Sequence, residues 1–152
     1  MYPEVETLAL TKLQSVTGFT DTTTKINTAR GKWGLLNSGN SDHYAIIKPG
    51  GFTRKQGAMS MNISMFEVVI QVWQRYIDDG SSMTNLEGYV KAIIALFDKW
   101  PKLGDTTDTI VDATISAGRE MQDRWNKDGA LVWLSQDLIL TVQEHNVIVY
   151  AE

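Results

Sequence analysis

Two long segments with alternating apolar residues, Met59–Arg75 and Ala130–Gln143, constrain the fold more than any other feature of the chain. Successive side chains of a β-strand point to opposite faces, so each segment is predicted to be a strand with one face in a core. In the first segment the apolar parity changes near Met65, which predicts a bulge or bend there. The predicted core residues of the two strands are Phe66, Val68, Ile70, Val72, Val132, Leu134, Leu138, Leu140 and Val142.

Two amphipathic helices are predicted beside these strands. The first spans Pro3–Thr17, where a proline suits the first turn, apolar residues recur every three or four positions, and Gly18 supplies a stop. The second spans Thr84–Trp100, where Thr84 and Glu87 form a capping box before a regular apolar stripe. A turn is predicted immediately before this second helix, at residues 78–81.

Two shorter strands and their turns complete the predicted fold. Asp42–Lys48 is predicted to be a strand, joined to the next one through a hairpin tip at Pro49–Gly57. Thr109–Ala117 alternates weakly, and Asn146 is predicted to end the last long strand before a short terminal one. The sequence therefore predicts a single α+β domain over residues 1–152: an antiparallel four- to five-stranded sheet with two amphipathic helices on one face.

The chain also reverses its charge along the sequence. Residues 22–58 contain six Lys or Arg and one Asp, a formal charge of +5, whereas the other residues contain eight basic and seventeen acidic side chains, a charge of −9. Residues 22–41 lack a regular apolar period, so they are predicted to form a long, extended basic arm. An acidic body with a basic arm is typical of a protein that docks onto copies of itself or onto partners.

The second face of the long strands carries large side chains as well. Val69 and Trp73 lie on the non-core parity of the first strand, and Trp133 and Ile139 on that of the second. Tryptophan is enriched at binding surfaces, which favours a protein interface on this face. The alternative is an ordinary surface, because scattered apolar residues also occur on solvated faces.

No catalytic or metal-binding pattern is found in the sequence. The chain has no cysteine and only two histidines, so it has no thiolate nucleophile and too few histidines for a typical zinc site. Nucleophile elbows, phosphate-binding loops and dinucleotide fingerprints are absent too. We therefore predict that the protein is not an enzyme and has no metal or cofactor.

Contact with nucleic acid is a weaker possibility. Phe52, Arg54 and Lys55 on the predicted hairpin tip are suited to a phosphate backbone, and Trp33 or Tyr44 is suited to stacking on bases. However, the chain carries a net charge of −4, whereas dedicated nucleic-acid domains are usually basic. The sequence is compatible with transient contact with DNA in a channel.

No apolar run approaches the ~20 residues that a membrane span needs, so no membrane partner is expected.

The order of these elements resembles that of the tail terminator, or tail completion, proteins of long-tailed, lambda-like bacteriophages. The features that carry the resemblance are the size of the chain, the opening helix Pro3–Thr17, the basic hairpin Asp42–Arg75, the capped helix Thr84–Trp100 and the closing strands Thr109–Gln143. The resemblance implies a structural virion protein, assembled in the host cytoplasm and located at the head-proximal end of the tail. There a homohexameric ring would cap the tail tube and present a surface to the head connector.

A ring subunit needs two different, complementary surfaces so that its head-to-tail contacts close. We predict that the basic arm and tip form one surface and that the second sheet face contributes apolar contacts. Two alternatives stay open: a head–tail connector or neck subunit, and a small nucleic-acid-binding accessory protein. The predicted interface residues are Lys25, Arg30, Lys32, Trp33, Phe52, Arg54, Lys55, Val69, Trp73, Trp133 and Ile139.

Overall fold

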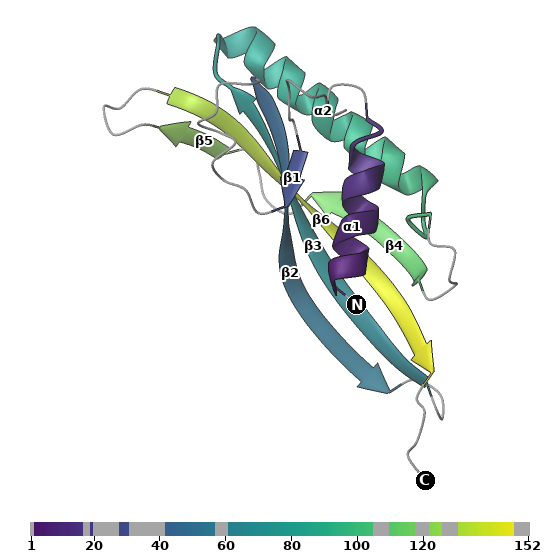
Figure 1. Cartoon of the computed structure of the whole chain (residues 1–152). Helices are drawn as coiled ribbons and strands as arrows, with labels where there is room; N and C mark the ends of the chain where they lie inside the picture. Colours follow the sequence, from purple (N-terminus) through teal and green to yellow (C-terminus); the bar gives the residue numbers. More distant parts are fainter. Residues whose placement is uncertain are drawn as a thin grey trace.

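The computed structural model describes residues 2–16, 19, 28–30, 42–56, 61–104, 110–117, 122–125 and 131–147. Two helices and six strands are found in these residues (Figure 1). In chain order they are α1 (Tyr2–Leu13), β1 (Thr28–Arg30), β2 (His43–Gln56), β3 (Met61–Arg75), α2 (Asp79–Lys99), β4 (Ile110–Ala117), β5 (Gln122–Trp125) and β6 (Leu131–Val147).

The six strands form one sheet in the order β1-β2-β3-β6-β4, and β5 pairs with the other end of β6. Strands β2, β3, β6 and β4 are antiparallel, which confirms the prediction of an α+β chain with an antiparallel sheet and two helices. Two short strands were not predicted. Of these, β5 is antiparallel to β6, whereas β1 runs parallel to β2, so the sheet is not wholly antiparallel.

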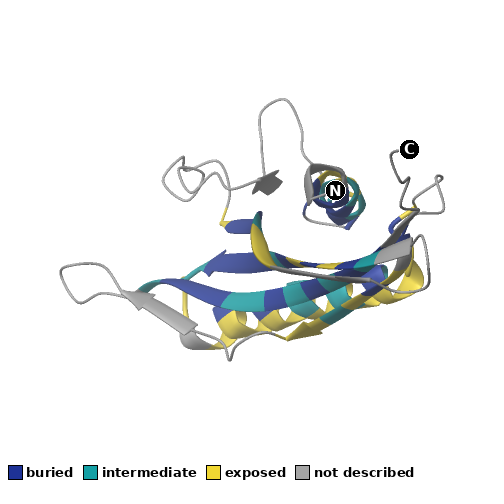
Figure 2. Cartoon of the chain, turned by 90° about the horizontal axis from the view of Figure 1, so that it is seen from below, coloured by how far each residue is buried: buried dark blue, intermediate teal, exposed yellow. Residues whose placement is uncertain are grey.

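One main hydrophobic cluster joins the sheet to both helices. Alternate residues of β2, β3, β6 and β4 join buried residues of both helices in a single hydrophobic cluster. Figure 2 shows these buried residues running along the strands. Every core residue predicted for the two long strands belongs to this cluster except Val132, which is half-buried and packs against the smaller cluster on the opposite face.

Helix α1 packs through the apolar stripe that its spacing predicts. Val5, Ala9 and Leu13 recur every four residues and are all buried, because positions four apart lie on the same side of a helix. In the last turn of α1, the Lys12 ammonium lies 3.4 Å from the centroid of the ring of Trp100, the residue that follows α2. This cation–π contact joins the ends of the two helices.

The start of α2 differs from the prediction. The residues predicted to be a turn, 78–81, contain the N-cap Asp78 and the first helical turn, so the helix begins five residues before Thr84. The Asp78 carboxylate accepts hydrogen bonds from the Ser81 backbone N–H at 2.7 Å and from the Ser81 hydroxyl at 2.8 Å. The Ser82 hydroxyl oxygen accepts a further bond from the Ile77 N–H at 2.8 Å. The bond from the Ser81 N–H satisfies one of the backbone donors that an uncapped helix start leaves unpaired.

The cap predicts a pH dependence that an Asp78→Asn variant should reduce. Hydrogen bonds from the Ser81 N–H and then the Ser81 hydroxyl lower the pKa of Asp78 below its ordinary value of 3.8. The ionised cap therefore stabilises the fold above pH 3.8, and this contribution is lost as the pH falls through the lower folded-state pKa. Asparagine caps without titrating, so the stability difference between wild type and variant should narrow in acid. Urea unfolding midpoints of the two proteins, measured from neutral pH down into acid, give this difference. A stability difference that stays constant with pH would contradict the role of the Asp78 carboxylate as the cap.

The predicted hairpin tip at Pro49–Gly57 is wrong. Strand β2 continues through this segment to Gln56, and the register against β3 shifts between Pro49 and Phe52. This bulge places Gly50 and Gly51 against Glu67: a Cβ on Gly50 would lie 2.9 Å from the Glu67 backbone oxygen. The two glycines thus mark a close approach of two strands rather than a turn.

Replacing Gly50 by alanine is expected to destabilise the fold by about 1–3 kcal/mol, because a strand backbone has to move to admit the new Cβ. The matched control is Gly88→Ala on α2, where a Cβ meets no atom within 4 Å. That control should stabilise the protein by about 0.5–1 kcal/mol through higher helix propensity. Chemical denaturation of the two variants measures both effects. Equal changes of the same sign would contradict the close approach at Gly50.

Three further predictions need correction. Within the predicted arm, residues 22–41, the described residues Thr28–Arg30 form β1 and pair with Ala45–Ile47 of the same chain; the other arm residues lie outside the described part. The predicted bulge near Met65 is not on β3, which pairs with β6 in one continuous register; the irregularity lies on the facing strand β2, between Pro49 and Phe52. Asn146 does not end the last strand, since β6 continues to Val147.

Within the described residues, neither helix combines the length and apolarity of a membrane span.

Candidate interaction surface

The sheet face opposite the core cluster brings together the non-core residues of the two long strands. Strands β3 and β6 are neighbours, and their register pairs Val69 with Ile139, Gln71 with Asp137 and Trp73 with Ser135. Val69 and Ile139 are half-buried and adjacent, as the alternation of each strand predicts. The pairing therefore unites on one face the four apolar residues predicted to serve an interface.

The two tryptophans of this face do not project into solvent. Trp73 and Trp133 are 7% and 8% exposed, and they form a second cluster with Tyr44 and Ile46 of β2. The indole rings of Trp73 and Trp133 meet edge to face with their centroids 6.5 Å apart, and Tyr44 lies 5.8 Å from Trp133. The Arg75 guanidinium lies 5.3 Å from the centroid of the Trp133 ring. In the single chain these rings therefore stabilise the sheet itself.

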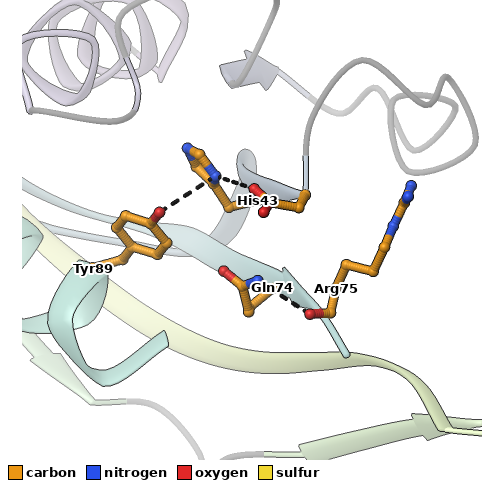
Figure 3. A network of polar contacts seen from close by, with 5 residues as sticks. His43, Gln74, Arg75 and Tyr89 are labelled. Atoms are coloured by element: carbon orange, nitrogen blue, oxygen red, sulfur yellow. Dashed lines mark hydrogen bonds and ion pairs between the residues drawn. The ribbon is translucent and has the colours of Figure 1, made fainter. Parts of the chain in front are cut away.

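His43, the first residue of β2, and Asp42 before it form a polar cluster with Tyr89 of α2 (Figure 3). Asp42 Oδ1 lies 2.7 Å from His43 Nδ1, which assigns the proton to that nitrogen as a donor to the carboxylate. The His43 ring stacks on the Tyr89 ring at a centroid distance of 4.6 Å, and the Phe19 ring meets His43 edge-on at 5.3 Å. Burial, and secondarily the charge of Asp42, raises the pKa of Tyr89. The hydroxyl thus stays neutral, and the cluster joins β2 to α2.

Nearby on β3, the Gln74 side-chain amide donates to the Arg75 backbone oxygen at 3.1 Å (Figure 3). Gln74 is fully buried and pairs with His43 in the β2–β3 register. Among the residues that the structure describes, no group of three or more His, Asp or Glu side chains is placed to hold a metal ion. The stacked rings of His43 and Tyr89 hold β2 and α2 together at this cluster.

The basic residues of the predicted interface are placed only in part. Arg30 lies on β1, and Phe52, Arg54 and Lys55 lie on β2 opposite Phe66, Ser64 and Ile63 of β3. Their backbone positions belong to the sheet, whereas their side chains lie outside the described residues. Lys25, Lys32 and Trp33 lie outside the described part of the chain.

One arrangement was missed from the sequence: charge is separated across the sheet. On one side of β3, strands β1 and β2 contain four Lys or Arg and no Asp or Glu. On the other side, β6 and β4 contain three acidic residues, Asp112, Asp137 and Glu144, and no Lys or Arg, while the short β5 adds one residue of each sign, Asp123 and Arg124. The charge reversal along the chain indicates that basic and acidic residues are segregated. Only the strand order shows that they lie on opposite sides of β3 in one sheet.

Comparison with known proteins supplies no relative from which to transfer a function. No protein-family model matches the chain. A search of curated proteins also finds no match.

Proposed function

We propose that this protein is a structural subunit that assembles with copies of itself into a closed ring and performs no catalysis. The observation that carries the proposal is the separation of charge across the sheet, with basic β1 and β2 on one side of β3 and acidic β6 and β4 on the other. A ring requires two different surfaces on each subunit that fit each other. Opposite charges at the two sides of one sheet meet that requirement and steer copies into head-to-tail contact.

The proposal also assigns a use to the two faces of the sheet. Buried residues of both helices share one cluster with a single face, which supports the predicted arrangement of two amphipathic helices on that face. The opposite face carries the half-buried pair Val69 and Ile139, which can add apolar contacts between subunits. The basic side of the proposed contact is β1 and β2, in place of the free arm on which the sequence prediction relied.

The resemblance of the element order to tail terminators extends the proposal to a biological setting. In that setting the ring is hexameric, caps the tail tube of a long-tailed bacteriophage and joins it to the head connector within the virion. Partners are then the chain itself, the tail tube protein and the connector, with transient contact between the ring and DNA in its channel. A neck subunit with the same architecture differs only in binding the portal or adaptor rather than the tube.

Electron micrographs of the purified protein mixed with tail tubes test this proposal. Rings at one end of each tube are the expected result. Binding to portal or adaptor complexes without binding to tubes would assign the chain to the neck instead. Salt-sensitive DNA binding by a monomer, weakened when Arg54 and Lys55 are replaced by alanine, would contradict the ring and support a nucleic-acid-binding accessory protein.

A further inference from the structure

Among the described residues, strand β4 forms one edge of the sheet, and its sequence lacks residues that commonly protect such an edge. Seven of its residues, Ile110 and Asp112–Ala117, pair with β6 on one side, and among the described residues no strand pairs with the other side of Asp112–Ala117. Natural edge strands are commonly protected by lysine, proline or a covering element. Strand β4 contains neither lysine nor proline, and its Asp112, Thr114 and Ser116 are exposed. An edge of this kind can accept a further strand through its backbone hydrogen-bonding groups.

Strand β2 offers a second edge on the opposite side of the sheet. The short β1 covers only Ala45–Ile47, whereas β2 continues to Gln56. Beyond the bulge, Phe52–Gln56 keeps a regular register against β3. This end of β2 extends past both helices together with the neighbouring ends of β3 and β6 (Figure 1). The two edges therefore lie at opposite sides of the sheet, each with a regular stretch of strand.

The registers place one residue of each edge on the same row of paired residues across the sheet. Thr53 pairs with Met65, Met65 with Gln143, and Gln143 with Asp112. Thr53 and Asp112 are thus the two ends of one row of residues, on opposite edges. In addition, β2, β3, β6 and β4 alternate in direction, so β4 of one copy would run antiparallel to β2 of a copy placed beside it. Copies placed side by side in this way would therefore form one continuous antiparallel sheet.

Charge selects the same pairing. Strand β4 carries one acidic residue, Asp112, and no basic one, whereas Phe52–Gln56 contains Arg54 and Lys55 and no acidic one. Pairing two β2 edges brings Arg54 and Lys55 of one copy near those of the other, whereas pairing two β4 edges offers Asp112 no opposite charge. Pairing β4 with β2 brings opposite charges together, which favours a heterologous contact.

We propose that the outer edge of β4 binds the Phe52–Gln56 edge of β2 in a second copy of this chain, so that the sheet continues across the subunit boundary. This inference rests on the proposed function and states how neighbouring subunits make contact. The backbone hydrogen bonds of the joined edges hold the contact, and the charges of Asp112, Arg54 and Lys55 set which edge meets which.

Disulfide cross-linking tests the contact directly, because the chain has no cysteine of its own. Thr53→Cys supplies one partner on β2. Asp112→Cys and Thr114→Cys supply two alternative partners on β4, one on the same row and one two residues along. Residues facing each other across paired strands have the Cα separation that a disulfide needs. The matched control combines Thr53→Cys with Asn85→Cys, an exposed position on α2.

Under mild oxidation, a chain with cysteines on both edges should give a ladder of covalent multiples, and the Asn85→Cys control should not. A mixture of the two single-cysteine chains should give covalent dimers containing one copy of each. If light scattering shows an assembly but neither edge pair cross-links, the inference fails and the proposed ring stands. Dimers formed by a β4-cysteine chain alone would overturn it in favour of β4–β4 pairing. A monomer at every concentration would overturn both proposals.

Discussion

Replacing Ile70 by alanine is expected to lower the free energy of unfolding by about 2–5 kcal/mol. Ile70 lies in the middle of β3, is fully buried, and belongs to the main cluster between the sheet and the helices. Its neighbours across the strands are Ile47 and Leu138, which are also fully buried. The substitution therefore leaves a cavity enclosed by core side chains. Chemical denaturation followed by circular dichroism measures the loss.

The chain offers a matched control with the same substitution. Ile77, which precedes α2, is 59% exposed. Its replacement by alanine should change the free energy of unfolding by no more than about 0.5 kcal/mol. Comparable losses at Ile70 and Ile77 would contradict the position of the core.

Trp133→Ala is expected to cost about 3–5 kcal/mol of stability in the separate subunit. The Trp133 ring packs against Trp73 and Tyr44 and lies beneath the Arg75 guanidinium, so the substitution removes several contacts within one chain. The comparison is Trp100→Ala, where the ring is 41% exposed and its described contact is with Lys12. Loss of that cation–π contact should cost about 0.5–1 kcal/mol.

This pair of variants also separates two roles for Trp133. If its indole stabilises the subunit, unfolding of the monomeric protein at low concentration should shift strongly towards lower denaturant. If Trp133 instead serves mainly as a contact residue between subunits, the unfolding midpoint of the monomer should stay near that of the wild type and only the association should weaken. The second result would contradict the intrachain cluster.

The regular parts of the fold could be predicted from the sequence because their apolar patterns are long. The alternation in β3 and β6 identifies both the strands and the residues they bury, and the four-residue spacing of Val5, Ala9 and Leu13 identifies α1. The parity of the two strands predicts that Val69 and Ile139 share a face, and the register of the structure then pairs them. These features depend on local periodicity, which a single sequence contains.

The features that were missed depend on contacts between distant residues. Gly50 and Gly51 have the composition of a turn, but the glycines are needed where β2 passes close to Glu67. Strands β1 and β5 are three and four residues long, too short to show a period. Tyr44 and Ile46 join the two tryptophans only because β2 lies beside β3. The start of α2 was misplaced because residues 78–81 have the composition of a turn, whereas the hydrogen bonds of Asp78 with Ser81 make them the helix cap and first turn.

The molar mass of the purified protein, measured by light scattering at low and high salt, tests most directly whether oppositely charged sides of the sheet bring copies together. The account predicts a mass of about six chains that falls as salt screens the contact. Lys55→Glu or Asp112→Lys alone should lower the mass at low salt, and the two changes combined in one chain should restore it. A mass of one chain at every salt and protein concentration would contradict the account.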